Sequence, residues 1–458
     1  MRLSGGGGSR VRASGPLGLR FALLSIRIPE VMHPRSIILF AATLCVTAPA
    51  LALEPSSSRD WPRWRGRDGA GVWDGARLPA ALTRAAVKER WSVPIGPGYA
   101  GIAVAGDRVF TLDRKDREAA SERVLCLSRQ SGETLWVKEY PARYGDLDHG
   151  NGPRSTPTVD RGRVYTLGAV GHLLCLEAVS GAVVWEIDAA KRFDAAMPIW
   201  GHSVSPLVFG DLVIAQIAAR PGGCVMAFDR ESGSPRWRVA DDRPGYSTPI
   251  IVRHRDRDTL VQWTADSLLA ITPATGELLW RAPFRTSNYD VAIASPLWRD
   301  GAVFASGYWD GARVFRTDAQ GPEQEPRLLW SHDRVPSCLM STPLLRGEHL
   351  YTIDRRDGLV CIEWGTGKLL WKDEHRVTAA GRNPHATLVW AGFEGTRAVA
   401  LSAEGDLVLL ELVPEGYREH GRVPIIGFTW AHPAFAGNEV FARSDERIVR
   451  VDIVAEGS

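Results

Sequence analysis

Residues that could bind a ligand gather in a few short segments of the 458-residue chain. These segments mix acids, amides, histidines, arginines and aromatic rings. The candidate site residues are Asp148, His149, Asn151, Arg154, Trp200, His202, Asp290, Tyr308, Trp309, Asp310, Arg382, His385, Trp430 and His432. Three kinds of chemistry are open to them: metal binding, anion binding, and stacking on a sugar or a peptide.

A metal is the first option. His385 and His432 stand where equivalent segments carry Ser or Thr, so neighbouring repeats could place them face to face. With Asp148, His149 or His202 they could bind a metal or an anionic ligand. Histidines in such positions more often hydrogen-bond to a neighbouring repeat and tie the structure together. We therefore expect a structural role and predict no metal site.

Calcium binding rests on Asp146, Asp148 and Asn151, whose side chains offer the oxygen ligands that calcium prefers. Their spacing is not that of an EF-hand loop. Acidic and amide side chains in such a run usually shape turns. We expect these residues to form a turn.

Anion binding and stacking are the remaining options. Arg154 and Arg382 could anchor a carboxylate or a sulfate, or form salt bridges between repeats. The run 308–311, Tyr-Trp-Asp-Gly, is typical of a hairpin tip that stacks on a sugar or a peptide, or caps its own strands. The sequence holds no nucleophile elbow, P-loop or HExxH motif, so we predict no catalytic residue and favour a protein that is not an enzyme.

The elements that position these segments come from a repeat of about 46 residues. One motif is a turn followed by tryptophan, with Gly and Trp four residues apart. Its copies are Gly132 with Trp136, Gly181 with Trp185, Gly233 with Trp237, Gly276 with Trp280 and Gly367 with Trp371. A second motif is Ser/Thr-Pro before apolar residues, at 156–157, 205–206, 248–249, 295–296 and 342–343. Trp91 and Trp330 extend the first series.

Short apolar runs between the motifs indicate four strands in each unit. Eight such units predict an all-β, eight-bladed β-propeller of four-stranded antiparallel blades. The turn glycine would join the third and fourth strands, and the tryptophan would fill the space between adjacent blades. The proline would open the innermost strand, whose free edge faces the central channel.

The ends of the repeat predict how the ring closes. The last unit, 438–453, ends after its third strand, and 89–93 is typical of an outer strand without a blade of its own. We expect these two segments to pair and remove the open sheet edge. The predicted domains are a leader at 1–52, an arm at 53–88 that packs on the ring through Trp61 and Trp64, and the propeller at 89–458.

The N-terminal 52 residues explain the net charge of +2. They hold six arginines and one glutamate, so the rest of the chain is slightly acidic and gives no support for nucleic-acid binding. Arg35, the apolar run 36–46 and the small residues at 48–52 predict a secretory signal peptide that starts at Met32 and is cleaved near Ala52. An uncleaved anchor is the alternative. We expect a periplasmic or secreted monomer without a later membrane span.

Five cysteines follow the leader, and three of them, Cys126, Cys175 and Cys361, sit between apolar residues. The number is odd and no CxxC motif occurs. We expect these cysteines to act as small apolar strand residues, without a disulfide or a zinc site.

The full motif at 227–237, with an acid before the turn, resembles the pyrroloquinoline quinone (PQQ) repeat. That repeat occurs in quinoprotein alcohol dehydrogenases and in non-catalytic propellers such as the lipoprotein of the bacterial outer-membrane protein assembly complex. The resemblance covers about 61–458. The runs 60–66 and 151–157 are also similar to a secreted PQQ-like group abundant in planctomycete-type bacteria, for which we know no defined activity.

The resemblance implies two different functions. The dehydrogenases carry adjacent cysteines over the quinone and a Glu/Asn/Asp set for calcium, whereas this sequence has no Cys-Cys pair and no CxxCH haem site. We therefore expect an exported, non-catalytic module that binds or scaffolds an unidentified protein or ligand of the cell envelope, without a cofactor. The alternative is an oxidoreductase of alcohols or sugars that uses PQQ and calcium. A second alternative is a polysaccharide-binding propeller.

Overall fold

The computed structural model describes residues 59–75, 77–145, 147–317 and 325–454. All of them belong to the second of two compact units, Leu51–Ser458. The predicted leader and signal peptide lie outside the described residues.

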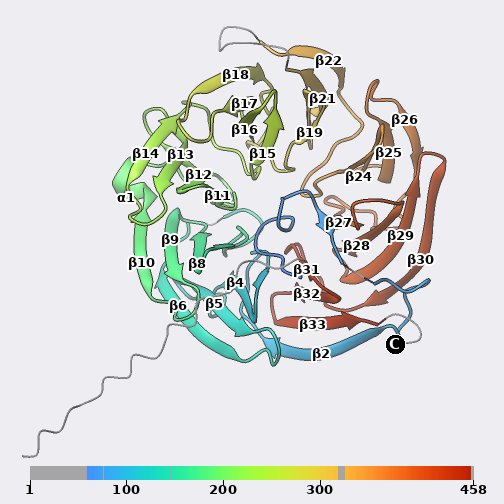
Figure 1. Ribbon diagram of the computed structural model, residues 1–458, viewed down its shortest axis with the longest axis horizontal. Helices are drawn as coiled ribbons and strands as arrows, with labels where there is room; N and C mark the ends of the chain where they lie inside the picture. Colours follow the sequence, from blue (N-terminus) through green and yellow to red (C-terminus); the bar gives the residue numbers. More distant parts are fainter. Residues whose placement is uncertain (1–58, 76, 146, 318–324, 455–458) are drawn as a thin grey trace, which may run out of the picture. The chain divides into compact units, whose positions relative to one another are not determined.

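The described residues form eight sheets arranged in a ring, whose innermost strands face the central axis (Figure 1). Blade 1 contains β3 (Ala103–Ala105), β4 (Arg108–Asp113), β5 (Ser121–Ser128) and β6 (Thr134–Pro141). Blade 2 contains β7 (Thr158–Asp160), β8 (Arg163–Leu167), β9 (His172–Glu177) and β10 (Val183–Asp188). Blade 3 contains β11 (Leu207–Phe209), β12 (Leu212–Ala219), β13 (Gly223–Asp229) and β14 (Pro235–Val239). Blade 4 contains β15 (Ile250–His254), β16 (Arg257–Trp263), β17 (Ser267–Ile271) and β18 (Leu278–Pro283).

The second half of the ring repeats this pattern. Blade 5 contains β19 (Leu297–Arg299), β20 (Ala302–Gly307), β21 (Gly311–Arg316) and β22 (Arg327–His332). Blade 6 contains β23 (Leu344–Arg346), β24 (His349–Asp354), β25 (Gly358–Glu363) and β26 (Leu369–Lys372). Blade 7 contains β27 (Ala386–Ala391), β28 (Arg397–Ser402), β29 (Asp406–Val413) and β30 (Gly416–Pro424). Blade 8 contains β31 (Ala434–Ala436), β32 (Glu439–Arg443), β33 (Arg447–Ile453) and β2 (Val87–Pro94). The predicted eight-bladed antiparallel propeller is confirmed.

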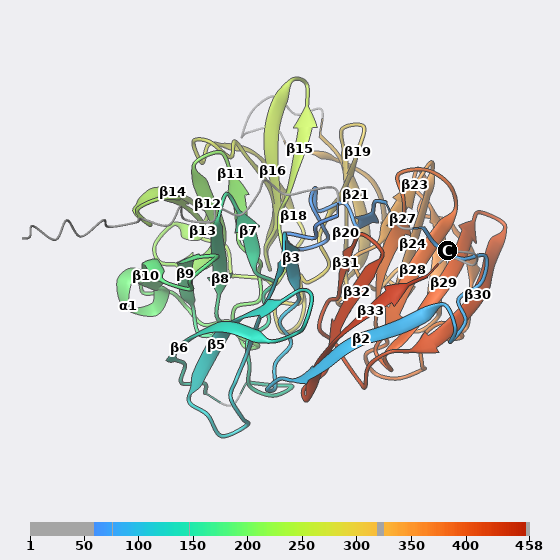
Figure 2. The same cartoon turned by 60° about the horizontal axis from the view of Figure 1, so that its bottom comes forward.

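Blade 8 closes the ring as expected. Strand β2 pairs antiparallel with β33, with Val87 opposite Ile453 and Pro94 opposite Arg447, and Figure 2 shows the two strands side by side. Two segments that are far apart in sequence thus complete one sheet. The buried Arg443 adds a second tie, because its guanidinium donates to the carbonyls of Leu112 and Gly96 at 2.5 and 2.6 Å.

Two local elements were not predicted. Strand β1 (Val72–Trp73) pairs parallel with β27 and adds a fifth strand to blade 7. Helix α1 (Ala189–Phe193) follows β10, and its Asp188 cap accepts a hydrogen bond from the backbone N–H of Lys191 at 3.2 Å. The described residues contain no helix with the length and apolarity needed to cross a membrane.

The turn-tryptophan motif joins neighbouring blades. The tryptophans lie on the outermost strands of their blades, and five of them pack on the turn glycine of the next blade: Trp91, Trp136, Trp185, Trp237 and Trp330. At the second junction, a Cβ added to Gly181, which has φ of +73°, would lie 2.6 Å from the Trp136 indole. The Trp136 N–H also donates to the Ala178 carbonyl of blade 2 at 3.1 Å. Glycine and tryptophan recur together because only a residue without a side chain admits the indole.

The three cysteines in apolar runs lie in third strands, opposite the outer-strand tryptophans. Cys126 faces Trp136, Cys175 faces Trp185, and both thiols are buried and free. Burial raises the pKa of the Cys126 thiol to about 12, which keeps it protonated and apolar. These residues contribute to packing at the blade junctions.

The Ser/Thr-Pro motif forms a second belt of contacts, around the channel. The Thr156 N–H donates to the Ser205 hydroxyl at 2.9 Å, and the Ser205 N–H donates to the Thr248 hydroxyl at 3.1 Å. Each contact joins one blade to the next. This belt fixes the connections that enter the innermost strands, and these connections build the site described below.

Candidate functional site

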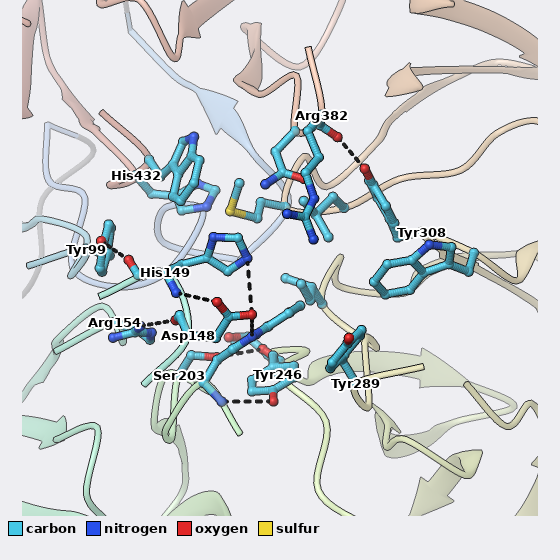
Figure 3. A pocket seen from close by; sticks show the side chains of 18 of the residues that line it. Tyr99, Asp148, His149, Arg154, Ser203, Tyr246, Tyr289, Tyr308, Arg382 and His432 are labelled. Atoms are coloured by element: carbon cyan, nitrogen blue, oxygen red, sulfur yellow. Dashed lines mark hydrogen bonds and ion pairs between the residues drawn. The ribbon is translucent and has the colours of Figure 1, made fainter. Parts of the chain in front are cut away.

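A pocket lies at one mouth of the central channel (Figure 3). Its volume is about 140 Å³. All eight connections between the last strand of one blade and the first strand of the next contribute to it, through residues such as Tyr99, Asp148, Trp200, Tyr246, Tyr289, Leu339, Arg382 and Trp430. Because every blade supplies at least one residue, the geometry of the pocket depends on the closed ring.

Aromatic side chains form an arc around the pocket. Trp200 stacks near Tyr246 and Tyr289, with ring centroids 5.2 and 6.4 Å apart. Tyr289 lies 5.7 Å from Trp309, and Trp309 lies 4.7 Å from Tyr308. Such rings provide large, rigid apolar surfaces at low entropic cost.

The arc continues on the other side of the mouth. The His149 ring lies 5.6 Å from Trp200 and 5.8 Å from Trp430, so it joins the two tryptophans. Trp430 in turn stacks near Tyr99 at 6.0 Å, and the Tyr99 hydroxyl donates to the His149 carbonyl. His149 itself has φ of 65°, which is in the left-handed region. The ring contacts hold this strained residue in place.

The N-terminal arm supplies the pocket with Trp64. Its indole N–H donates to the Ser295 hydroxyl at 3.1 Å, and its ring lies 4.1 Å from His432. The next residue, Arg65, is buried and donates to the carbonyls of Thr342, Pro343 and Leu388 on the inner edges of blades 6 and 7. The arm is therefore held inside the ring, where the blue segment of Figure 1 lies.

The apolar part of the pocket lining comes from blades 4 to 6. Ile293, Leu339 and Met340 pack in one cluster with Tyr308 and Trp309. This surface carries no charge. An apolar or aromatic group of a ligand would gain free energy by burying its surface there, away from water.

Arg154 lines the pocket and organises its own loop. Its guanidinium donates to the carbonyls of Gly152 and Gly150 at 2.5 and 2.6 Å and lies 4.9 Å from the centre of the Tyr99 ring. Desolvation lowers the pKa of Arg154, yet the group stays charged at neutral pH. Among the described residues Arg154 forms no salt bridge between blades, and the Glu122 carboxylate favours its charge only through a longer-range interaction.

Arg382 is exposed and also lines the pocket. Its backbone carbonyl accepts a hydrogen bond from the Tyr308 hydroxyl, which fixes the segment (Figure 3). Across the described ranges its guanidinium has no hydrogen-bond or ion-pair partner. Of the two arginines, Arg382 is the one whose donors are free for a ligand.

Asp148 is the acidic residue of the lining. Its carboxylate accepts from the His149 N–H at 3.0 Å and from the Trp200 indole N–H at 3.4 Å. The His149 ring nitrogen Nε2 lies 3.8 Å from the same carboxylate. The Asp148 carboxylate therefore has its partners within the pocket, and these interactions orient Trp200 and His149.

His385 and His432 do face each other, with ring centroids 5.4 Å apart. Each ring is bound to a hydroxyl of the preceding blade: His385 Nδ1 to Ser341 at 3.2 Å, and His432 Nδ1 to Thr387 at 2.9 Å. Desolvation lowers the pKa of His385 to about 4 and that of His432 well below its usual value. Both are neutral links between blades, and only His432 lines the pocket.

Five predicted site residues do not line the pocket: Asn151, His202, Asp290, Asp310 and His385. His202 is buried, and desolvation lowers its pKa to about 4. Asn151 accepts from the Leu147 N–H at 3.1 Å, which is the turn role expected of it. Asp290 pairs with Arg243, and Asp310 accepts from the Ser287 N–H at 3.0 Å. These side chains stabilise the loops around the site.

Three of the four tyrosines that line the pocket are not among the residues predicted from the sequence. Tyr99, Tyr246 and Tyr289 line the pocket, as do Trp64, Ser203, Thr248, Ile293, Leu339, Met340 and Asn383. Tyr99 and Tyr246 occupy the same place as Trp200 and Trp430, a few residues before an inner strand. Scanning every such connection for aromatic residues would have found them.

No group of three or more His, Cys, Asp or Glu side chains able to hold a metal occurs within the ranges described above. The proposed calcium set has no support in the geometry of Asp148 and Asn151. Asn151 closes a turn, and Asp148 points to Trp200 and His149. Asp146 lies outside the described residues.

Fold and repeat together define the class of this molecule: it is a PQQ-like β-propeller with an aromatic pocket at the channel mouth. The model of the family described as "Outer membrane protein assembly factor BamB" matches residues 120–373. This match spans more than half of the chain, so the chain belongs to that family.

Individual relatives are distant. The chain is 23% identical over 299 residues to the outer membrane protein assembly factor BamB of Shewanella oneidensis, a match that covers 62% of this chain and 72% of the relative. It is 22% identical over 318 residues to the BamB of Moranella endobia, covering 64% and 74%.

Solved structures share the fold. BamB from Moraxella catarrhalis superposes with a TM-score of 0.54 at 18% identity, over 80% of this chain and 99% of that one. The quinohemoprotein alcohol dehydrogenase from Comamonas testosteroni superposes with a TM-score of 0.63 at 12% identity, over 87% and 81%. At these identities the likeness concerns the fold alone.

Proposed function

We propose that this protein is an exported, non-catalytic binding module of the cell envelope, and that its partner or ligand docks at the channel-mouth pocket. One observation carries the proposal: all eight blade connections converge on one aromatic pocket, which also contains Arg382, an arginine whose guanidinium has no partner among the residues that the structure describes. Concave, mostly apolar sites with a few polar groups are the usual binding sites of proteins.

The chemistry of the pocket favours binding over catalysis. Its histidines have structural tasks: His432 binds the Thr387 hydroxyl, and His149 lies between two tryptophans. Asp148 is held by the Trp200 indole, so it is not paired with a nucleophile. The sequence also has no Cys-Cys pair of the kind that the quinoprotein dehydrogenases carry.

The relatives support the same proposal. Their names describe factors in the assembly of outer membrane proteins, a task in the cell envelope. An envelope location also agrees with the signal peptide predicted for residues 32–52. We propose that the protein acts there without a cofactor, and that residues 53–88 form an arm that completes the 89–458 propeller.

Two measurements on the purified mature chain test the proposal. Incubation with PQQ and calcium should give no absorbance change and no dye reduction with alcohols or sugars. Capture of envelope components should be lost in a Trp200→Ala, Trp309→Ala double variant and kept in a Leu135→Ala variant, whose side chain is 44% exposed on the outer strand β6. Dye reduction that depends on PQQ, or capture that ignores the pocket, would contradict the proposal.

A further inference from the structure

We infer that the channel-mouth pocket binds a polypeptide segment in which an aromatic side chain stands next to a carboxylate. This inference rests on the proposed function and specifies the partner of the same site.

The shape and polarity of the lining favour an aromatic anchor. The volume of about 140 Å³ is suited to one side chain. Ile293, Leu339 and Met340 provide an uncharged surface, and the rings of Trp200 and Trp309 flank it. An aromatic side chain gains both apolar burial and ring contacts in such a place.

The charges of the lining favour a carboxylate beside that anchor. Arg154 is a half-buried cation whose hydrogen bonds go only to carbonyls, and the Arg382 guanidinium has no partner within the described part of the chain. Asp148 is engaged by Trp200 and His149. The free positive charge of the pocket therefore favours an anionic group on the ligand. A guanidinium can bind a carboxylate through two hydrogen bonds.

The rim favours a polypeptide over a sugar. Three of the connections that form the pocket also carry exposed apolar side chains. These are Ile199, Tyr289 and Phe428, which are 48%, 52% and 63% exposed. Exposed apolar side chains around a pocket lined with Trp, Tyr and Arg match the composition of protein interfaces. A polyhydroxylated chain gains little from such a rim.

A second cavity adjoins the pocket and could hold the part of a bound polypeptide that follows the anchor residue. It has a volume of about 410 Å³ and shares Tyr99, His149 and Trp430 with the first. Phe428 lines it as well. A ligand longer than one residue can thus continue from the pocket across the face of the ring.

Isothermal titration with blocked tetrapeptides tests the inference. The probes are Gly-Phe-Asp-Gly and its isosteric amide Gly-Phe-Asn-Gly. We expect the aspartate peptide to bind about tenfold more tightly or better, since a hydrogen bond to an ionised carboxylate is stronger than one to a neutral amide. Arg382→Met should remove this preference, because it removes the free guanidinium.

Two variants control for folding and for general charge. Arg143→Met changes an exposed arginine in the same blade connection as Arg154 that does not line the pocket, and it should leave the preference intact. Trp309→Ala should abolish binding of both peptides while the melting temperature changes little, because Trp309 is only partly buried.

The outcomes separate the two proposals. Equal binding of the two peptides, or a preference that survives in Arg382→Met, overturns the inference. Absence of binding by both peptides also overturns the inference, whether or not PQQ or an oligomer of glucuronate binds to the pocket. If envelope components are still captured through Trp200 and Trp309 while the peptides are silent, the proposed function stands and only the inference fails.

Discussion

Replacement of Gly276 by alanine tests how the turn-tryptophan motif joins the blades. Gly276 has φ of +78°, and a Cβ there would lie 2.7 Å from Trp237 of the preceding blade. The left-handed backbone costs a residue with a side chain about 1–2 kcal/mol. Overpacking against the indole adds about 1–3 kcal/mol. We expect Gly276→Ala to lower the free energy of unfolding by about 2–5 kcal/mol.

Gly162 provides the matched control. Its φ is +77°, and a Cβ there would meet nothing within 4 Å. Gly162→Ala should therefore cost only the backbone component, about 1–2 kcal/mol. The difference between the two substitutions measures the contact with the tryptophan.

A double-mutant cycle with Trp237→Ala completes the test. The single change Trp237→Ala should cost about 3–5 kcal/mol, because it empties a buried site and leaves the Pro273 carbonyl without its 3.0 Å hydrogen bond. In this background Gly276→Ala should cost no more than Gly162→Ala does. Urea unfolding followed by circular dichroism gives all four values. Equal costs for Gly276→Ala with and without the indole would show that the contact with Trp237 does not contribute.

Three further predictions concern the buried histidines, the arm and the ring closure. The pKa of His385 is lowered to about 4, so the folded state keeps it neutral and stability is lost as pH falls from 6.5 towards 4. Between pH 7 and 5, His385→Asn should therefore lose about 2 kcal/mol less stability than the parent in urea titrations, and an equal loss in both would contradict the buried neutral state of His385. Arg65→Met should free the arm, seen as faster tryptic cleavage at 59–67 by mass spectrometry, and unchanged cleavage would contradict the role of its carbonyl contacts. Arg443→Met should lower the melting temperature more than Arg447→Met, whose side chain is 44% exposed, and equal shifts would argue against the tie between blades 8 and 1.

The fold could be predicted from sequence because its contacts repeat. The glycine-to-tryptophan spacing recurs at one junction after another, and the unpaired segment at 89–93 has one suitable place, beside β33. Strand β1 and helix α1 each occur once. No period marks them, and the two residues of β1 form a strand only because the arm brings them to β27.

The site could be predicted in position but only partly in composition. The segments before the inner strands converge in the structure, and the predicted candidates Trp200, Trp309, Arg154 and Arg382 line the same pocket. His202 and His385 belong to the same kind of segment, yet their side chains are buried in contacts with the blades. The sequence does not show which way a side chain in these connections points, because that depends on the packing of the next blade.

Trp64 is a pocket residue whose long-range contact no sequence pattern could predict. It is about 230 residues away in sequence from its partner Ser295, and it enters the pocket from the arm through the ring. No local pattern connects the two residues. The contact exists because Arg65 finds acceptors at the open inner edges of blades 6 and 7, where strands present carbonyls to the channel.

Site-specific photocrosslinking in intact cells tests the central claim, that the channel mouth is the binding face. A photoreactive phenylalanine replaces Tyr289, at the rim of the pocket, or Leu135, on the outer strand β6; the two side chains are 52% and 44% exposed. We predict a discrete adduct with one envelope component from position 289, absent in the Trp200→Ala, Trp309→Ala background, and none from position 135. An adduct from position 135 alone, or one from 289 that persists without the two tryptophans, would contradict the account.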